Sequence, residues 1–127
     1  TVGDFMVSTP VCVQYWQTLA YARQLMLSHS FSYLPMWDDK KMSWWLLSDM
    51  AMARYLRPTW PSDDKKKQSI QEAAAKGLIL QETKTVKTTV LVADLLQNET
   101  PLGLWLVAND AYPAHHLVGV LSPFELM

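Results

Sequence analysis

The segment LVGVLSPFELM at residues 117–127 has the pattern of a short apolar strand that runs directly into a helix. Its first part carries no charged residue and is typical of a buried strand. Ser122 is a suitable helix N-cap, and Pro123 is well placed as the first helical residue. The segment WWLLSDMAM at residues 44–52 repeats the pattern, with Ser48 in the place of Ser122. Two such junctions indicate that the chain contains two related halves.

Both halves are expected to follow one order of elements: strand, helix, strand, turn, strand, helix. Thr18 is the expected N-cap of the first long helix, and Gly77 is placed to end a later one. In the first half, we expect strands at 10–13, 31–37 and 42–47 and helices at 19–26 and 48–56. In the second half, we expect strands at 78–81, 102–108 and 117–121 and helices at 70–76, 90–96 and 122–127.

Each half alone has too few elements to cover its own sheet, so the halves are expected to share one core. The predicted fold class is therefore α/β, with two tandem β-α-β-β-α repeats packed as one compact module. The first repeat is expected at residues 1–57 and the second at residues 70–127. Residues 58–69 combine prolines with the charge run DDKKK and are the predicted linker.

The composition is that of a globular protein of one ordinary domain. Of the 127 residues, 50% are hydrophobic and 18% are charged, which argues against intrinsic disorder. The net charge of -1 argues against a nucleic-acid partner. No apolar run approaches the roughly 20 residues that cross a bilayer, so no membrane contact is expected. A start at Thr1 instead of Met is expected for a processed chain or a piece of a longer protein.

Cys12 is the single cysteine, so no intrachain disulfide can form. It lies between two valines, where we expect a small buried side chain and not a nucleophile. An unpaired thiol fits a cytoplasmic location. The neighbouring His115 and His116 point to opposite sides of an extended backbone, and no zinc-ligand spacing is present. We therefore expect no metal site.

Catalytic motifs are also missing from the sequence. The four glycines form neither of the common phosphate-binding loops. No Ser-His-acid arrangement carries a recognisable motif. We therefore expect a ligand-sensing or interaction module and not an enzyme.

Several segments resemble the CBS (cystathionine-β-synthase-type) domain. The opening TVGDFM, the helix LAYARQLM at 19–26 and the strand FSYLPM at 31–36 resemble the first part of such a repeat. Residues 117–127 resemble its closing pattern of Gly, two hydrophobic residues, Thr or Ser, two variable residues and Asp. The resemblance covers nearly the whole chain as two tandem repeats, a Bateman module. It implies two sheets that face each other about a pseudo-twofold axis, a regulatory role toward a partner domain or protein, and a homodimer.

The resemblance also implies a ligand, an adenosyl compound such as AMP, ADP, ATP or S-adenosylmethionine, in a cleft between the repeats. Ser122, followed by Pro123, would contact the phosphate or ribose. Glu125 would hold the ribose hydroxyls in place of the family's Asp. The adenine pocket would be lined by Val11, Val13 and Val120. The alternative for this segment is a Ser-x-x-Glu capping box, which requires no ligand.

The first repeat departs from the family pattern. Ser48 aligns with the Thr or Ser, but Ala51 stands where the Asp is expected. Asp49 is the nearest carboxylate, and an acidic residue there also simply favours the helix dipole. Trp45 replaces the Gly. We therefore expect at most one well-formed ligand site, the one at Ser122.

Two functions stay open on these grounds. The first is a regulatory module that binds an adenosyl ligand. The second is a degenerate CBS pair that works as a dimerisation or protein-interaction domain without ligand, which Trp45 and Ala51 favour. For either function, the candidate dimer face is a helix surface with Met50, Met52 and Tyr55.

Overall fold

The computed structural model describes residues 1–8, 10–57, 65–96 and 104–121. Contacts within the chain divide it into two compact units. Unit 1 combines Thr1–Pro10 with Thr83–Met127, and unit 2 is the continuous stretch Val11–Glu82. Each unit has its own sheet, and each is described by itself.

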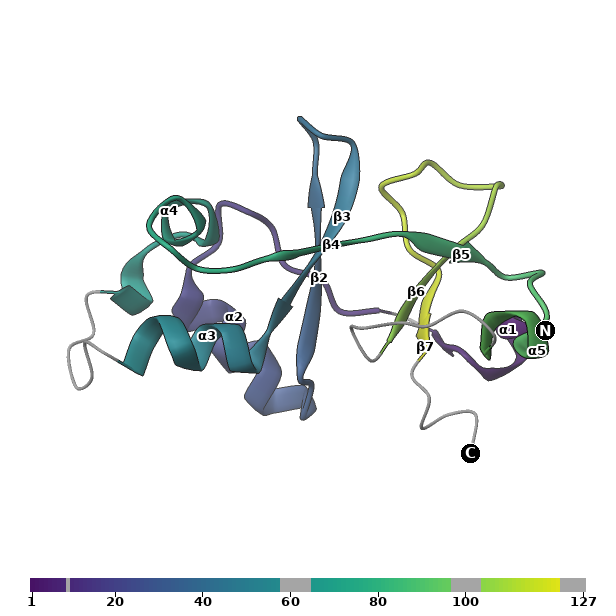
Figure 1. Cartoon of the computed structure of the whole chain (residues 1–127), viewed down its shortest axis with the longest axis horizontal. Coiled ribbons are helices and arrows are strands. Elements are labelled where there is room, and N and C mark those ends of the chain that lie inside the picture. Colours follow the sequence, from purple (N-terminus) through teal and green to yellow (C-terminus); the bar gives the residue numbers. More distant parts are fainter. Residues whose placement is uncertain (9, 58–64, 97–103, 122–127) are drawn as a thin grey trace. The chain divides into compact units, whose positions relative to one another are not determined.

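Unit 2 is built on the hairpin of β2 (Tyr33–Asp38) and β3 (Ser43–Ser48), to which β4 (Gln81–Thr83) adds beside β3. The hairpin is antiparallel, from the pair Tyr33 and Ser48 to the pair Asp38 and Ser43. In Figure 1 the helices of this unit lie to one side of the hairpin. They are α2 (Leu19–His29), α3 (Asp49–Leu56), the 3-10 turn η2 (Lys65–Lys67) and α4 (Ile70–Ala75).

The core of unit 2 forms between the helices and one face of the hairpin. Because side chains alternate along a strand, Leu34 and its partner Leu47 share a face with Met36 and its partner Trp45. Leu34 and Leu47 are fully buried, and Trp45 packs at the margin of the cluster. The helices contribute the buried side chains Leu19, Ala22, Met26, Met52, Tyr55, Ile70 and Ala73.

Unit 1 has a four-stranded sheet in the order β1 (Val7–Ser8), β7 (Gly119–Leu121), β6 (Trp105–Ala108), β5 (Thr85–Lys87). Strand β5 runs parallel to β6, whereas β6 with β7 and β7 with β1 are antiparallel. The short helices α1 (Val2–Phe5) and α5 (Val92–Leu96) complete the unit. Its core cluster consists of Val2, Trp105, Val107 and Leu121.

The two units repeat one pairing scheme, in which each sheet includes a strand from the other half of the sequence. Each has an antiparallel hairpin, β2–β3 or β6–β7, with a parallel partner beside its first strand. That partner is a single bridge from Val13 to Met36 in unit 2 and the strand β5 in unit 1. The second hairpin strand pairs with a strand from the other half of the sequence, β4 or β1. This correspondence supports the predicted tandem repeats, while the boundaries 1–57, 58–69 and 70–127 stay a prediction.

Locally specified features of the sequence are confirmed. Thr18 caps α2 by accepting a hydrogen bond from the Tyr21 amide at 3.1 Å. Gly77 follows α4 with φ of 123°, a conformation that glycine adopts without a steric penalty. The polar turn between β2 and β3 also lies where the charged residues predict it.

Three expectations about strands are corrected. Residues 10–13 form no strand beyond the Val13 bridge, because a turn closed by the Gln17 amide on the Gln14 carbonyl follows at once. The strand expected at 78–81 begins at Gln81, because Leu78 still bonds back to Ala73 of α4. Strand β5 was not expected at all, since its sequence TVK is short and polar. Residues 102–103 and 122–127 lie outside the described part.

Leu47 gives a test of the unit 2 core. It is fully buried between the hairpin and the helices, so Leu47→Ala should leave a cavity. We expect a loss of about 2–5 kcal/mol in the free energy of unfolding, measured by urea denaturation. Ile79→Ala is the control, because Ile79 is 69% exposed and should change the stability by about 0.5 kcal/mol or less. Equal losses in both variants would contradict this core.

Candidate functional site

The structure places the predicted ligand residues in three groups. Val11, Val13, Ser48 and Asp49 belong to unit 2. Val120 belongs to β7 of unit 1, where its side chain is half-buried. Ser122, Pro123 and Glu125 lie outside the described residues. The second-half site therefore stays a prediction, and the first-half residues can be examined in detail.

Ser48 ends β3 and is the N-cap of α3. Its Oγ accepts a hydrogen bond from the Ala51 amide at 3.0 Å. The Asp49 amide donates to the Ser32 carbonyl at 2.9 Å, and Asp49 Oδ1 accepts from the Met50 amide at 2.7 Å. The first three backbone N–H groups of α3, which would otherwise be available to an anion, are thus bonded within the protein.

The two valines of unit 2 differ in accessibility. Val13 is fully buried, and its amide donates to the Pro35 carbonyl at 2.9 Å. Val11 is half-buried and packs against the same core cluster. Of the two, only Val11 retains surface that a bound molecule could touch.

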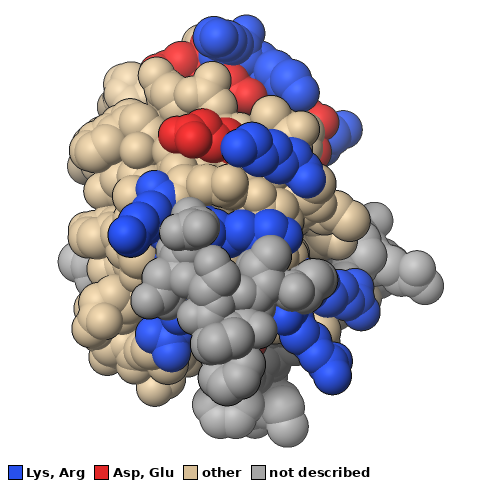
Figure 2. Space-filling model, turned by 90° about the vertical axis from the view of Figure 1, so that its left-hand side faces the viewer, with Lys and Arg blue, Asp and Glu red and all other residues tan. Residues whose placement is uncertain are grey.

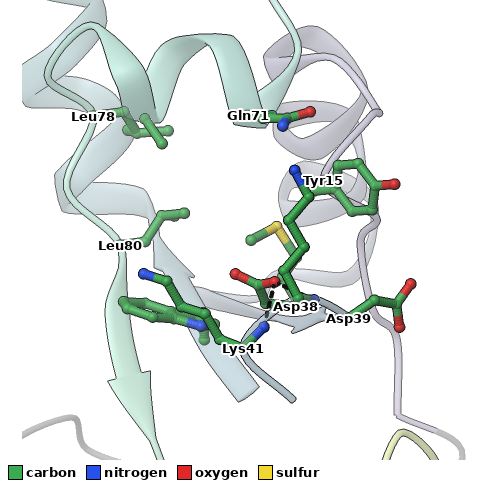
Figure 3. A pocket seen from close by; sticks show the side chains of 11 residues that line it. Tyr15, Asp38, Asp39, Lys41, Gln71, Leu78 and Leu80 are labelled. Atoms are coloured by element: carbon green, nitrogen blue, oxygen red, sulfur yellow. Dashed lines mark hydrogen bonds between the residues drawn. The ribbon is translucent and has the colours of Figure 1, made fainter. Parts of the chain in front are cut away.

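A pocket of about 310 Å³ lies elsewhere in unit 2, around the turn of the β2–β3 hairpin. Figure 3 shows Gln71 on α4, Leu78 and Leu80 along the segment that runs from α4 toward β4, and Asp38 and Lys41 on the hairpin. The Asp39 carboxylate points away from the other labelled side chains (Figure 3). The remaining lining residues are Tyr15, Met36, Lys40, Trp45 and Ala74.

Hydrogen bonds and one cation–π contact order the hairpin side of this pocket. Asp38 Oδ1 accepts from the backbone amides of Lys40 at 2.9 Å and Lys41 at 3.2 Å. Trp45 Nε1 donates to Ser43 Oγ at 3.0 Å. The Lys41 ammonium lies 4.8 Å from the centre of the Trp45 ring, within range of a cation–π interaction. Trp45 and the charged turn are the only parts of this pocket that stand out in the sequence. The sequence does not indicate that they lie close to α4 in the folded chain.

Charged side chains of both signs lie on the face seen in Figure 2. On the face seen in Figure 2, acidic and basic side chains mix in the upper part, and basic ones lie beside the grey residues lower down. Within the described ranges, no three His, Cys, Asp or Glu side chains cluster in a way that could hold a metal ion. None of the helices described is long and apolar enough to cross a membrane.

Comparisons with solved structures identify the fold. Hypoxic Response Protein I, solved with two coordinated zinc ions, is 21% identical and superposes with a TM-score of 0.71 over 99% of this chain and 95% of its own. The CBS-pair protein CBSX2 of Arabidopsis thaliana is 19% identical, with a TM-score of 0.70 over 99% and 90% of the two chains. The chain has the fold of a CBS-domain pair. A putative acetoin utilization protein, AcuB of Vibrio cholerae, also superposes, with 17% identity, a TM-score of 0.70 and coverage of 98% and 85%.

At the level of sequence the similarity is weak. No family sequence model matches this chain, and no curated protein matches it significantly. The fold is therefore established by structure, while the function has to be argued from the site.

Ser48 gives a prediction about capping. Because its hydroxyl satisfies the Ala51 amide, Ser48→Ala should lower the free energy of unfolding by about 1 kcal/mol. Ser48→Thr keeps the acceptor and should recover most of that loss. Urea denaturation of the three proteins measures the effect, and an Ala variant as stable as the parent would show that the cap contributes nothing.

Cys12 gives a prediction about pH. Burial raises the pKa of its thiol to about 11 from an ordinary value of 9.0. At pH 8 the folded chain should therefore react with iodoacetamide about a hundredfold more slowly than the chain unfolded in denaturant. Because the neutral thiol is the form favoured by folding, its contribution to stability is full below pH 9 and is lost as the pH rises through 11. Equal alkylation rates in the two states would contradict the burial.

Proposed function

We propose that this CBS pair is a non-catalytic regulatory module that binds an adenosyl ligand, namely AMP, ADP, ATP or S-adenosylmethionine. The observation that carries the proposal is the whole-chain likeness to CBSX2 in complex with AMP, with a TM-score of 0.68 over 99% of this chain. The proposal includes a cytoplasmic location, a homodimer and a partner domain or protein whose activity the module controls.

The second-half site at Ser122 and Glu125 is the proposed place for the ligand. In the first half, the N–H groups at the start of α3 are already paired with Ser32, Ser48 and Asp49. An anion at this position would have to displace those partners, and Ala51 offers no carboxylate for a ribose. These contacts support a single adenosyl site and not two.

The alternative is a CBS pair that works as a protein-interaction domain without a ligand. The blocked helix start in the first half and the replacement of Gly by Trp45 favour it. The expected dimer face on α3 needs a correction, however. Met52 and Tyr55 are buried in the core of unit 2, because they lie on the side of α3 that faces the hairpin, and only Met50 is exposed.

A thermal-shift screen against the four adenosyl compounds and GTP separates the two functions. A ligand present at about 100 times its Kd should add about 2.7 kcal/mol to the free energy of unfolding. Glu125→Ala should weaken the binding of that ligand by about 1.5–3 kcal/mol, because it removes a charged hydrogen-bond acceptor. Glu82→Ala, at an exposed glutamate of β4, is the matched control and should leave the affinity unchanged. No shift with any adenosyl compound at millimolar concentration would favour the interaction domain.

A further inference from the structure

The pocket at the hairpin turn is separate from the Ser48 end of the same hairpin. The strand pairs run from Tyr33 with Ser48 at one end to Asp38 with Ser43 at the other. At about 3.3 Å per residue, the two ends are roughly 17 Å apart along the strands. None of the four residues of unit 2 proposed to hold an adenosyl ligand lines this pocket; they are Val11, Val13, Ser48 and Asp49.

One side of the pocket is apolar and its shape is fixed. Met36, Ala74, Leu78 and Leu80 line it together with the indole of Trp45. Met36 and Leu78 are buried core residues, so this wall is anchored in the packed interior of unit 2. The indole is held by its bond to Ser43 on one edge and by the Lys41 ammonium over its face. Such a wall is suited to an apolar side chain or a flat ring.

The rim of the pocket carries charges of both signs. Asp38 uses only Oδ1 for the backbone of the turn, and its Oδ2 has no hydrogen-bond partner among the described residues. Lys40 and Lys41 also line the pocket, the Lys41 ammonium over the Trp45 ring, and neither lysine forms an ion pair with a described residue. A carboxylate and two ammonium groups beside one apolar wall match a ligand that carries both charges itself.

The second half of the chain lacks the side chain that forms the wall of this pocket. Trp45 pairs with Met36, which bridges to Val13, and the equivalent position in unit 1 is Gly119. Gly119 occupies the same place in the pairing scheme, opposite Val107 on β6. The half with the family's Gly therefore has no side chain to form the wall. The substitution that departs from the family pattern in the first half is also the one that builds the pocket.

We propose that the pocket binds a free apolar α-amino acid as its zwitterion. The ammonium group bonds to Asp38 Oδ2, the carboxylate bonds to Lys40 and Lys41, and the side chain lies against Trp45 and Leu80. A volume of about 310 Å³ is at the lower limit of ligand pockets, which suits a molecule as small as one amino acid. This site goes beyond the proposed adenosyl site and gives the module a second input.

Isothermal titration of the full chain with L-phenylalanine at low ionic strength tests the proposal. N-acetyl-L-phenylalanine lacks the ammonium and L-phenylalaninamide lacks the carboxylate, and each should bind at least about tenfold more weakly. Glycine lacks the apolar side chain and should not bind detectably. Equal binding of phenylalanine and its N-acetyl derivative would overturn the zwitterion assignment.

Variants locate the site. Asp38→Asn keeps an oxygen for the turn amides but loses the carboxylate, and it should weaken phenylalanine binding at least about tenfold. Lys41→Gln on the exposed rim should also weaken it, and Lys76→Gln, an equally exposed lysine outside the pocket, should not. Glu125→Ala should leave phenylalanine binding intact. Absence of binding to the parent protein, or binding that neither pocket variant changes, would falsify the proposal.

Discussion

The exchange of strands between the halves is the constraint on which the rest of this structure depends. The unit 2 sheet receives β4 from the second half, and the unit 1 sheet receives β1 from the first half. Main-chain hydrogen bonds carry both exchanges, so they tolerate almost any side chain. This explains how two halves with little sequence in common keep one pairing scheme. It also explains why the compact units cross the boundaries of the sequence repeats.

Within that scheme the two halves have diverged at equivalent positions. In the first half, the start of α3 is closed by bonds from Ser48 and its neighbours, and the hairpin carries Trp45. In the second half, Gly119 leaves the corresponding strand position without a side chain. Such divergence is a common consequence of duplication in a fold, since function lies in sites placed on a scaffold and not in the scaffold itself.

Local signals in the sequence were sufficient for much of the fold. The caps at Thr18 and Ser48 could be predicted because a cap is decided by a few adjacent residues. Strand β5 could not, because its polar residues are held by pairing with β6, some 20 positions away. The pocket could not be predicted from the sequence either, because it too depends on contacts between residues that are far apart along the chain. Its walls come from a hairpin turn, a helix and an extended segment, and only the folded chain brings Trp45, Gln71 and Leu80 together.

The two units differ in when their strands become available during synthesis. Unit 2 is one continuous stretch, from Val11 to Glu82, and every strand it needs has been made before unit 1 can be finished. Strand β1 precedes the whole of unit 2 in the sequence, yet its partner β7 ends at Leu121. Strand β1 must therefore wait for β7 until all of unit 2 has been synthesised. Long-range pairing of this kind slows folding, so β1 gains its partner only after the strands of unit 2 can already pair with one another.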